Sequence, residues 1–384
     1  MEKKLSWALA ATLVCGASVF TACSSDNDDN ADRPETPVVK AIINETSFPD
    51  ANFRRFLLEQ DYGKDGTLTD VEIANIRVLN VAEKEIGSLK GIEYLAALDT
   101  LNCSGNLLEV LDLSKNVALK SVDCGFNNLT ALDVSNNLAL EILACGFNHI
   151  ASLNVVHNAM LRDIVCGYND LTSLDVSKNT ALTVLSCHSN KLNSLDVSRN
   201  TALESLQCSD NNLAVLDVSK NTKLTMLDCS TDRLTSLDVT KNTALTNLEC
   251  GDNGLTSLDV SKNTALTILF CENNKLTSLD ASKNTALTDL SCEHNELTSL
   301  VVSKDSPLNT LFCYRNKISG KYMDDLISSL PQNTSTATYR ISVIDTSEGD
   351  EGNVLTPSQT AAVKAKRWTP LYWEVSEKRW KEIE

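Results

Sequence analysis

Eleven cysteines recur at a constant interval in this sequence, and their thiols are its most obvious candidates for chemistry. The 384 residues contain thirteen cysteines, and these eleven stand 21 residues apart. They are Cys103, Cys124, Cys145, Cys166, Cys187, Cys208, Cys229, Cys250, Cys271, Cys292 and Cys313. Thiolates bind metal ions, and pairs of thiols form disulfides. Either chemistry requires the side chains to meet in space, so the repeat that positions them has to be interpreted first.

The cysteines belong to a 21-residue repeat that runs from Leu98 to about Ile318 without insertion or deletion. A fixed period between 20 and 50 residues indicates a solenoid, and the pattern L-x-x-L-x-C-x-x-N-x-L is that of a leucine-rich repeat. In such a solenoid, short strands stack into one parallel sheet and alternate side chains point inward. Leucine, valine and cysteine form the inward set. The sequence therefore predicts a leucine-rich-repeat solenoid with a parallel sheet on its concave face and short turns on its convex side.

This arrangement argues against both metal binding and disulfides in the cysteine ladder. Metal ligands converge on one point, whereas these thiols lie in a line inside a leucine core. A disulfide needs Cβ atoms about 3.5–4.5 Å apart and suitably directed, but side chains on stacked strands stay near the strand spacing of about 4.8 Å. We interpret the eleven cysteines as buried free thiols that pack as small hydrophobic side chains.

An asparagine follows most of these cysteines by three residues, where the chain leaves the strand. These asparagines are Asn106, Asn127, Asn148, Asn169, Asn190, Asn211, Asn253, Asn274, Asn295 and Asn316. An amide both donates and accepts hydrogen bonds, so it can satisfy the backbone groups of a buried turn. The seventh repeat carries Asp232 instead, and the sequence predicts a local weak point there. The remainder of each repeat is expected to form a brief extended run and a turn at Asn-Thr.

The N-terminus resembles a bacterial lipoprotein signal, which implies cleavage after residue 22 and lipidation of Cys23. Two lysines precede an apolar run from Leu5 to Phe20 that is too short for a comfortable membrane span. Phe20 departs from the lipoprotein pattern, because an aliphatic residue is commoner at that position. An ordinary secretory leader and an uncleaved anchor are the alternatives.

Residues 23–40 are polar, acidic and interrupted by proline, so we expect a disordered tether. An acidic run after a lipidated cysteine is similar to the signal that places lipoproteins of some Gram-negative anaerobes on the outer surface. The resemblance implies a lipid anchor in the outer membrane and exposure at the cell surface. The alternative is a spacer in a lipoprotein that faces the periplasm.

Composition and motifs exclude several classes of function. The net charge is −17, so no basic face is available to meet the phosphates of a nucleic acid. The sequence contains no G-x-S-x-G elbow, P-loop or H-E-x-x-H motif. The four histidines, His149, His157, His188 and His294, fall at unrelated repeat positions and cannot converge. We therefore predict that the chain is not an enzyme.

Residues 41–75 are predicted to cap the first repeat with two helices, because the end of a solenoid needs a cover. Ser47 and Asp50 read as a capping box for the first helix, with Pro49 in its first turn, and Thr69 and Glu72 read as one for the second.

The loop of this cap, residues 61–72, matches an EF-hand calcium loop at positions 1, 5, 6 and 12. Asp61, Asp65, Thr67 and Glu72 are the candidate calcium ligands. Gly63 stands at position 3 and supplies no side-chain oxygen. The capping box accounts for Glu72 without a metal, so we favour a structural helix-loop-helix with no cofactor and keep calcium as the alternative.

Residues 76–318 hold one irregular 22-residue repeat followed by eleven 21-residue repeats, the last of which merges into a C-terminal cap. Residues 319–384 are predicted to form this small α/β cap. We expect a helix over 319–330, a strand over 339–343, a helix that begins at a Thr356 capping box, and a strand with an aromatic cluster over 368–373.

The chain from Ala41 to Ile318 resembles the internalins, in particular the internalin J-like branch, because an EF-hand-like cap precedes short repeats whose strand carries cysteine. The resemblance implies a non-enzymatic surface protein whose concave face binds host or matrix molecules. The sequence departs from internalins of Gram-positive cells in its anchor, since no wall-sorting module is recognisable.

Outward positions of the repeat vary while the inward frame does not, so a ligand has to be recognised there. Phe126, Phe147 and Tyr168 occupy one position in three successive repeats, and Ile142 and Val165 lie alongside. Exposed aromatic side chains in a row are favoured binding anchors. Rings folded over the sheet edge as extra core are the alternative.

Further along, an acidic stripe is interrupted by Phe270, Phe312 and Tyr314, which are further candidate ligand-binding residues. Its members are Asp228, Glu249, Asp252, Glu272, Asp289 and Glu293. A solvated face is the simplest interpretation, although such charge also steers a basic partner. We predict a monomeric, adhesin-like recognition module, anchored at the cell surface, that binds a protein or glycan through its concave face. The alternative is an accessory envelope lipoprotein with a spacing or self-association role.

Overall fold

The computed structural model describes residues 36–333, 339–345, 347, 349, 351–374 and 377–384. The predicted leader, the lipidation site Cys23 and most of the predicted tether lie outside these residues. Val38–Glu384 form one compact unit. Within the described residues, no helix is long and apolar enough to cross a bilayer.

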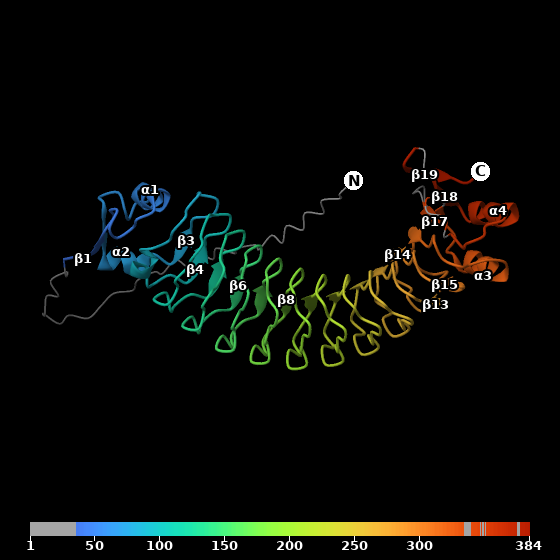
Figure 1. Ribbon diagram of the computed structural model, residues 1–384, viewed down its shortest axis with the longest axis horizontal. Coiled ribbons are helices and arrows are strands. Elements are labelled where there is room, and N and C mark those ends of the chain that lie inside the picture. Colours follow the sequence, from blue (N-terminus) through green and yellow to red (C-terminus); the bar gives the residue numbers. More distant parts are fainter. Residues whose placement is uncertain (1–35, 334–338, 346, 348, 350, 375–376) are drawn as a thin grey trace, which may run out of the picture. The chain divides into compact units, whose positions relative to one another are not determined.

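The unit is built around a 15-stranded sheet whose repeat strands are parallel and follow one another along the solenoid (Figure 1). The repeat strands are β3 (Val78–Asn80), β4 (Thr100–Asn102), β5 (Ser121–Asp123), β6 (Ile142–Ala144), β7 (Asp163–Val165), β8 (Val184–Ser186), β9 (Ser205–Gln207), β10 (Met226–Asp228), β11 (Asn247–Glu249), β12 (Ile268–Phe270), β14 (Asp289–Ser291) and β16 (Thr310–Phe312). Each strand pairs in register, so that Leu185 of β8 lies between Ile164 and Leu206. The central residue of each strand is buried. This confirms the predicted leucine-rich-repeat solenoid.

Near the C-terminal end, the extended run that was predicted in each repeat forms a second, two-stranded parallel sheet. Its strands are β13 (Ser278–Ala281) and β15 (Ser299–Val302). In earlier repeats the same positions make isolated bridges, such as that between Leu132 and Leu153. Each repeat thus has a strand on one side and an extended segment on the other, with leucine, valine and cysteine between them.

All eleven ladder cysteines are buried and free, as predicted. The backbone N–H of each cysteine adds one hydrogen bond to the sheet. For example, the Cys103 N–H donates to the Asp123 carbonyl at 2.8 Å. Burial raises the pKa of the thiols, as at Cys187, because a thiolate would have to form inside an apolar core. The cysteines therefore serve packing.

The predicted asparagines form a hydrogen-bond ladder that joins neighbouring repeats. Asn190 donates from Nδ2 to the carbonyls of Cys187 and Cys166, both at 3.1 Å, and its Oδ1 accepts from the Leu171 N–H at 2.9 Å. One side chain thus satisfies backbone groups of its own repeat and of the preceding one. The residue before each of these asparagines, for example Ser189, has a left-handed backbone.

A second asparagine ladder runs along the opposite side of the repeats, where the sequence predicted only a turn. Its members are Asn116, Asn137, Asn158, Asn179, Asn200, Asn221, Asn242, Asn263 and Asn284, all fully buried. Asn200 is typical: its Nδ2 donates to the carbonyls of Val176 at 3.0 Å and Asn179 at 2.9 Å. The turn at Asn-Thr is therefore also a buried connection between repeats.

The N-terminal cap combines a short hairpin with two helices. Strand β1 (Val39–Ile42) pairs antiparallel with β2 (Thr67–Thr69), and the helices are α1 (Ala51–Glu59) and α2 (Asp70–Asn75). A 3-10 turn, Ile92–Tyr94, follows in the first repeat. Strand β1 begins inside the predicted tether of residues 23–40, so the folded unit starts earlier than expected.

The predicted start of the first helix was wrong. Asp50, not Ser47, is the N-cap of α1, because its Oδ1 accepts from the N–H groups of Asn52 and Phe53 at 2.9 Å. Pro49 consequently precedes the helix. The second oxygen of Asp50 accepts from the Gly87 N–H at 2.9 Å, which ties the cap to the first repeat. The capping box predicted for α2 is confirmed.

The C-terminal cap extends the sheet. Its elements are α3 (Lys321–Ser329), β17 (Tyr339–Asp345), α4 (Pro357–Ala365), β18 (Trp368–Glu374) and β19 (Arg379–Glu382). The helices and two parallel strands agree with the prediction, whereas the antiparallel β19 was not foreseen. Asn353 continues the asparagine ladder: its Nδ2 donates to the carbonyls of Cys313 at 2.8 Å and Val343 at 2.9 Å, and its Oδ1 accepts from Ile318.

Candidate functional site

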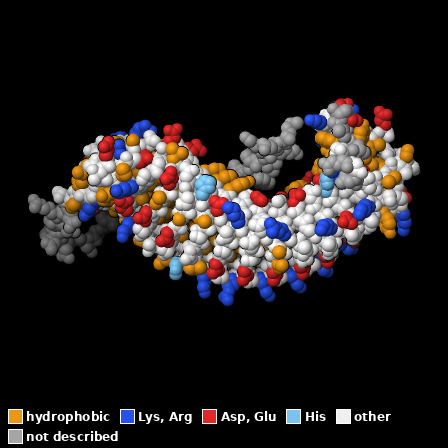
Figure 2. Space-filling model, viewed as in Figure 1, with side chains coloured by type: hydrophobic (Ala, Val, Ile, Leu, Met, Phe, Trp, Pro, Cys, Tyr) orange, Lys and Arg blue, Asp and Glu red, His pale blue; other side chains and the backbone are white. Residues whose placement is uncertain are grey.

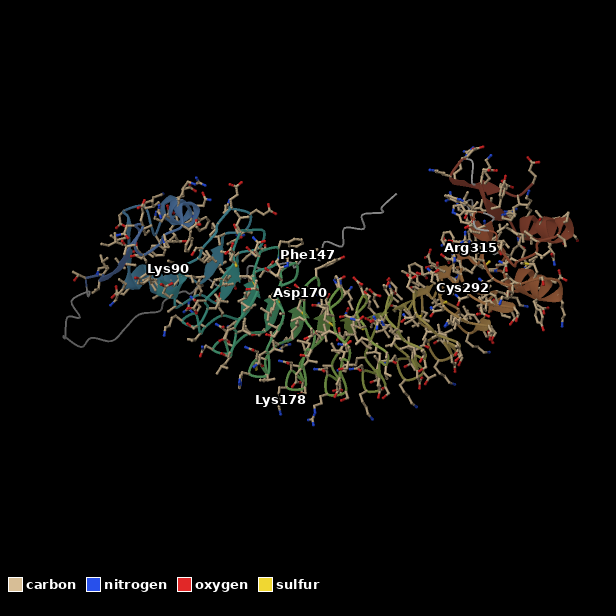
Figure 3. The ribbon with its side chains drawn as sticks, in the orientation of Figure 1. Lys90, Phe147, Asp170, Lys178, Cys292 and Arg315 are labelled. Atoms are coloured by element: carbon tan, nitrogen blue, oxygen red, sulfur yellow. The ribbon has the colours of Figure 1, made fainter. Side chains whose placement is uncertain are left out.

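Three aromatic rings stack on one another in the turns that follow strands β5, β6 and β7. The ring centroids of Phe126 and Phe147 are 4.2 Å apart with an interplanar angle of 11°, and those of Phe147 and Tyr168 are 4.2 Å apart with an angle of 20°. We call these three rings the aromatic ridge. Figure 3 places Phe147 at the upper rim, on the side away from Lys178 at the lower rim, and Figure 2 shows apolar side chains gathered at that upper rim.

The ridge is part of the surface and not of the core. Phe126 is 60% exposed, Phe147 43% and Tyr168 47%. The sequence alone allowed these rings to fold over the sheet edge as extra core, but their exposure rules that arrangement out. Their role in binding a ligand stays a prediction.

The backbone of the ridge is held in a conformation that bulky residues rarely adopt. Phe126, Phe147 and Tyr168 have φ angles of 53°, 56° and 54°, in the left-handed region. The same place in other repeats holds residues such as Asp210 and Asn273, which tolerate this region. A left-handed residue other than glycine costs roughly 1–2 kcal/mol, and stacking returns about 0.5–1.5 kcal/mol per aromatic pair. Stability alone therefore gives no clear reason to place aromatic residues here.

A glycine before each ring lets the turns approach closely. A Cβ atom on Gly146 would lie 2.9 Å from the carbonyl oxygen of Gly167, and one on Gly125 would lie 3.2 Å from that of Gly146. The glycines therefore allow neighbouring turns to pack backbone against backbone, which supports the short spacing between the rings.

The two ends of the ridge differ. At one end His188 packs edge-on against Tyr168, with centroids 5.0 Å apart and an interplanar angle of 89°. Burial lowers the pKa of His188, which favours the neutral imidazole. At the other end, the ridge position of the preceding repeat is Gly105, which has no side chain.

The remaining predicted residues of this region flank the ridge on the sheet. Ile142, the first residue of β6, is 41% exposed. Val165, the last residue of β7, is partly buried. Both point away from the core, as predicted, because they flank the buried central residues of their strands.

The C-terminal aromatics form a separate group, so the predicted residues do not make one site. Phe270 ends β12 and Phe312 ends β16, with β14 between them. Tyr314 packs against Trp380 at 5.0 Å and His294 at 5.5 Å. Strands β8 to β11 separate this group from the ridge.

The acidic stripe contains carboxyl groups with raised pKa values. The pKa of Glu272 rises to about 7, mainly because of burial and further because of nearby Glu293, Asp252 and Glu249. Burial also raises the pKa of Glu249 and Glu293. These groups crowd negative charge over the C-terminal half of the sheet, which opposes anionic ligands and attracts basic ones.

In the predicted calcium loop, each carboxylate has a local partner. Asp61 pairs with Lys64 at 2.5 Å, and Asp65 Oδ1 accepts from the N–H and hydroxyl groups of Thr67 at 2.8 and 2.9 Å. Glu72 Oε2 accepts from Thr69 in the capping box. Among the described residues, no group of three or more His, Cys, Asp or Glu side chains is arranged to hold a metal ion. Structural use of the loop without a cofactor stays a prediction.

Sequence reasoning missed two parts of the ridge region, the closing histidine His188 and the open end at Gly105. His188 stands one residue before the ridge position of its repeat, and Gly105 stands at the ridge position itself. A comparison of the ridge position across all repeats would have identified Gly105, because glycine has no side chain there.

Comparison with known proteins agrees with this architecture. No protein-family model matches the chain, and no curated protein matches its sequence. The functional domain of InlJ from Listeria monocytogenes, described as including a cysteine ladder, is 29% identical over 79% of this chain and 81% of that one, with a TM-score of 0.55. The internalin InlF from the same species is 23% identical, with 88% of this chain and 98% of that chain covered and a TM-score of 0.73.

A plant leucine-rich-repeat ectodomain is also similar in fold. That of the receptor kinase GASSHO1/SCHENGEN3 from Arabidopsis thaliana, solved in complex with CASPARIAN STRIP INTEGRITY FACTOR 2, is 19% identical, with 78% of this chain and 42% of that chain covered and a TM-score of 0.56. The present chain is thus a leucine-rich-repeat protein with a cysteine ladder. Its structural neighbours include internalins, as the sequence resemblance predicted.

Proposed function

We propose that this protein is a non-enzymatic recognition module, anchored at the cell surface, that binds a protein ligand through the aromatic ridge. The observation that carries the proposal is the row of three exposed, stacked rings on left-handed backbone. Exposed aromatic clusters are favoured as binding anchors because burying them in a complex removes a large apolar area from water.

The geometry of the rings favours a protein over a glycan. Both faces of Phe147 are covered, one by Phe126 and the other by Tyr168. Tyr168 has Phe147 on one face and His188 packed against it. Sugar rings stack on open aromatic faces, whereas here only the outer face of Phe126 is open and the rest of the ridge offers ring edges. A ridge of apolar edges suits insertion between the side chains of a protein partner.

The anchor is proposed from the sequence. The segment that ends at Cys23 resembles a lipoprotein signal, and an acidic tether follows it. InlJ and InlF are bacterial proteins of the internalin type, and the plant ectodomain belongs to a membrane receptor kinase solved in complex with CASPARIAN STRIP INTEGRITY FACTOR 2. Proteins that share this fold thus include one that binds a protein factor, and the fold is compatible with the proposed surface location.

The double variant Phe147→Ala/Tyr168→Ala tests this function. Immobilised wild-type protein is exposed to solubilised host-cell surface proteins and, separately, to an array of glycans, and bound species are quantified. We expect wild type to retain particular proteins. The double variant should bind them at least tenfold more weakly, which is a loss of about 1.4 kcal/mol in binding free energy. Because both rings are exposed, the melting temperature should stay within a few degrees.

The matched control is Phe270→Ala/Phe312→Ala, which removes two rings from the C-terminal half and should bind like wild type. Equal retention by wild type and by the ridge variant would contradict a binding role for the ridge. Ridge-dependent binding to glycans alone would replace the protein ligand by a glycan. Self-association of the wild type as its main interaction would favour the accessory role.

A further inference from the structure

The aromatic ridge ends in an open ring face. Phe147 lies on one face of Phe126, and no other ring contact to Phe126 occurs among the described residues. The ridge position of the preceding repeat is Gly105, with a left-handed φ of 66° and no side chain. Phe126 is accordingly the most exposed of the three rings, at 60% against 43% and 47%. No side chain from the ridge position of the preceding repeat therefore covers the outer face of Phe126.

A carboxylate stands on the far side of that space. Glu83 belongs to the turn of the irregular first repeat, where it also has a left-handed backbone, and its N–H donates to the Ser104 carbonyl at 2.9 Å. A Cβ atom on Gly105 would lie 3.0 Å from Cγ of Glu83, so the Glu83 side chain flanks the glycine. Along the solenoid the order is thus Glu83, an empty position at Gly105, and then the ring of Phe126.

These two boundaries define the chemistry of a ligand group. Successive rings in the ridge are 4.2 Å apart, so the missing ring leaves room for one planar group on the open face. The ring face attracts a cation through its quadrupole, and the exposed carboxylate of Glu83 supplies the opposite charge. The local run Glu83-Lys84-Glu85 is net acidic. A guanidinium group is planar, cationic and stacks on aromatic rings, whereas an ammonium group is compact and strongly hydrated.

We propose that the space between Glu83 and Phe126, above Gly105, is an arginine slot: a protein partner inserts an arginine side chain that stacks on Phe126 and pairs with Glu83. This inference rests on the proposed function and specifies its partner as one that presents a basic segment. The strongly negative net charge of the chain, −17, favours the approach of such a segment. An anionic ligand group would be repelled by Glu83.

The test uses the full-length chain and two fluorescent peptides that are identical except that one carries three arginines and the other three lysines. Binding is measured by fluorescence anisotropy at physiological salt, where long-range attraction is largely screened. We expect wild type to bind the arginine peptide about threefold more tightly than the lysine peptide, the size of an exposed cation–π contact. Phe126→Leu should bring the ratio to about one, because it removes the ring and keeps an apolar side chain.

A second variant closes the slot without removing the ring. Gly105→Phe adds one ring on a backbone that is left-handed as in the neighbouring aromatic repeats. The new Cβ would lie 3.0 Å from Cγ of Glu83 and push that side chain aside. Both effects close the slot, so this variant should also abolish the preference for arginine. Glu83→Gln should weaken binding of the arginine peptide, whereas Glu204→Gln, which removes an exposed charge far along the array, should leave it unchanged.

Equal affinity of wild type for the two peptides, or an arginine preference that survives in Phe126→Leu, would overturn the slot. This result is distinguishable from failure of the proposed function. If Phe147→Ala/Tyr168→Ala still loses its protein ligand while the peptides show no preference, the ridge binds and the slot is wrong. If neither experiment depends on the rings, both proposals fail.

Discussion

Asp232 interrupts the asparagine ladder, and its environment explains why the sequence predicts a weak point. Its Oδ1 accepts from the Leu213 N–H at 2.9 Å, as an asparagine would. Its Oδ2 has no hydrogen-bond partner among the described residues, at the place where an asparagine Nδ2 would donate to backbone carbonyls. Burial is the main cause that raises the pKa of Asp232 to about 7. Between pH 3.8 and about 7, the folded protein therefore holds a proton there that the unfolded chain releases.

Asp232→Asn should stabilise the protein by about 1–2 kcal/mol at pH 8, because the amide restores donors to the carbonyls of Cys208 and Cys229. Asn253, one repeat later, makes the equivalent bonds to Cys229 and Cys250. The gain should shrink as the pH falls below 7, since the protonated carboxyl of the wild type can itself donate. Urea unfolding at pH 8 and pH 5 measures both effects.

The reverse substitution in an intact repeat, Asn211→Asp, is the matched control. Asn211 donates to the carbonyls of Cys187 and Cys208, so its replacement should destabilise the protein at pH 8 and less so at pH 5. A neutral or destabilising effect of Asp232→Asn at pH 8 would show that the ladder does not depend on the missing donors.

At the scale of elements, local sequence signals predicted which helices and strands exist better than where they begin. Thr69 and Thr356 head capping boxes that the structure confirms. Ser47 offered an equally good local signal, yet Asp50 caps α1, because its second oxygen also binds the first repeat through Gly87. A contact between elements decided this boundary, and spacing along the chain does not contain it.

The helix-loop-helix of the N-terminal cap should be indifferent to calcium. Glu72 is held by the capping box and Asp65 by Thr67, so their oxygens already accept hydrogen bonds in the loop. We expect the melting temperature to change by less than about 1 °C with millimolar calcium or with a chelator, because a ligand at free concentration c stabilises the native state, by RT ln(1 + c/Kd), only if it binds there.

A rise in melting temperature with calcium that disappears in Asp65→Asn would instead assign calcium to this loop. Asp70→Asn provides a control, because that carboxylate lies outside the candidate ligand set and accepts from the Val38 N–H. A calcium effect that persists in Asp65→Asn but not in Asp70→Asn would place the ion elsewhere in the cap.

At the scale of the whole molecule, periodicity was sufficient to predict the solenoid, its buried thiols and the first asparagine ladder. A strict period makes every repeat an equivalent neighbour, so one inward set specifies the whole core. The second ladder was missed because burial of Asn200 depends on carbonyls of the preceding repeat, which no local motif displays. The ridge was predicted as a row of rings, but its exposure, left-handed backbone and open end at Gly105 depend on three-dimensional packing.

The charge pattern of the molecule predicts maximum stability in mildly acidic solution. Groups on the sheet side have pKa values raised chiefly by burial, to about 7 at Asp232 and Glu272 and in the same direction at Asp123, Glu249 and Glu293. A carboxyl whose folded pKa is raised binds its proton more tightly in the native state. Its stabilising contribution is therefore complete in acid and lost as the pH rises from about 4 to about 7.

The aspartates of the outer turns act in the opposite direction. Asp175, Asp217 and their equivalents have pKa values lowered from 3.8 because they accept hydrogen bonds from the serine two residues later. Their contribution is present above 3.8 and is lost as the pH falls through their lowered values. Burial lowers the pKa of His188 from 6.5, so protonation of this one residue also destabilises the native state as the pH falls.

Melting temperature measured at constant ionic strength should therefore pass through a maximum near pH 5 and decline towards pH 8. Asp232→Asn/Glu272→Gln should flatten the decline, because it removes the two groups whose native pKa values lie near 7. Asp175→Asn, which changes an outer turn, should leave the limb between pH 5 and pH 8 unaltered. A melting temperature that rises from pH 5 to pH 8 in wild type would mean that the carboxyl groups of the sheet are solvated well enough to ionise at their ordinary values.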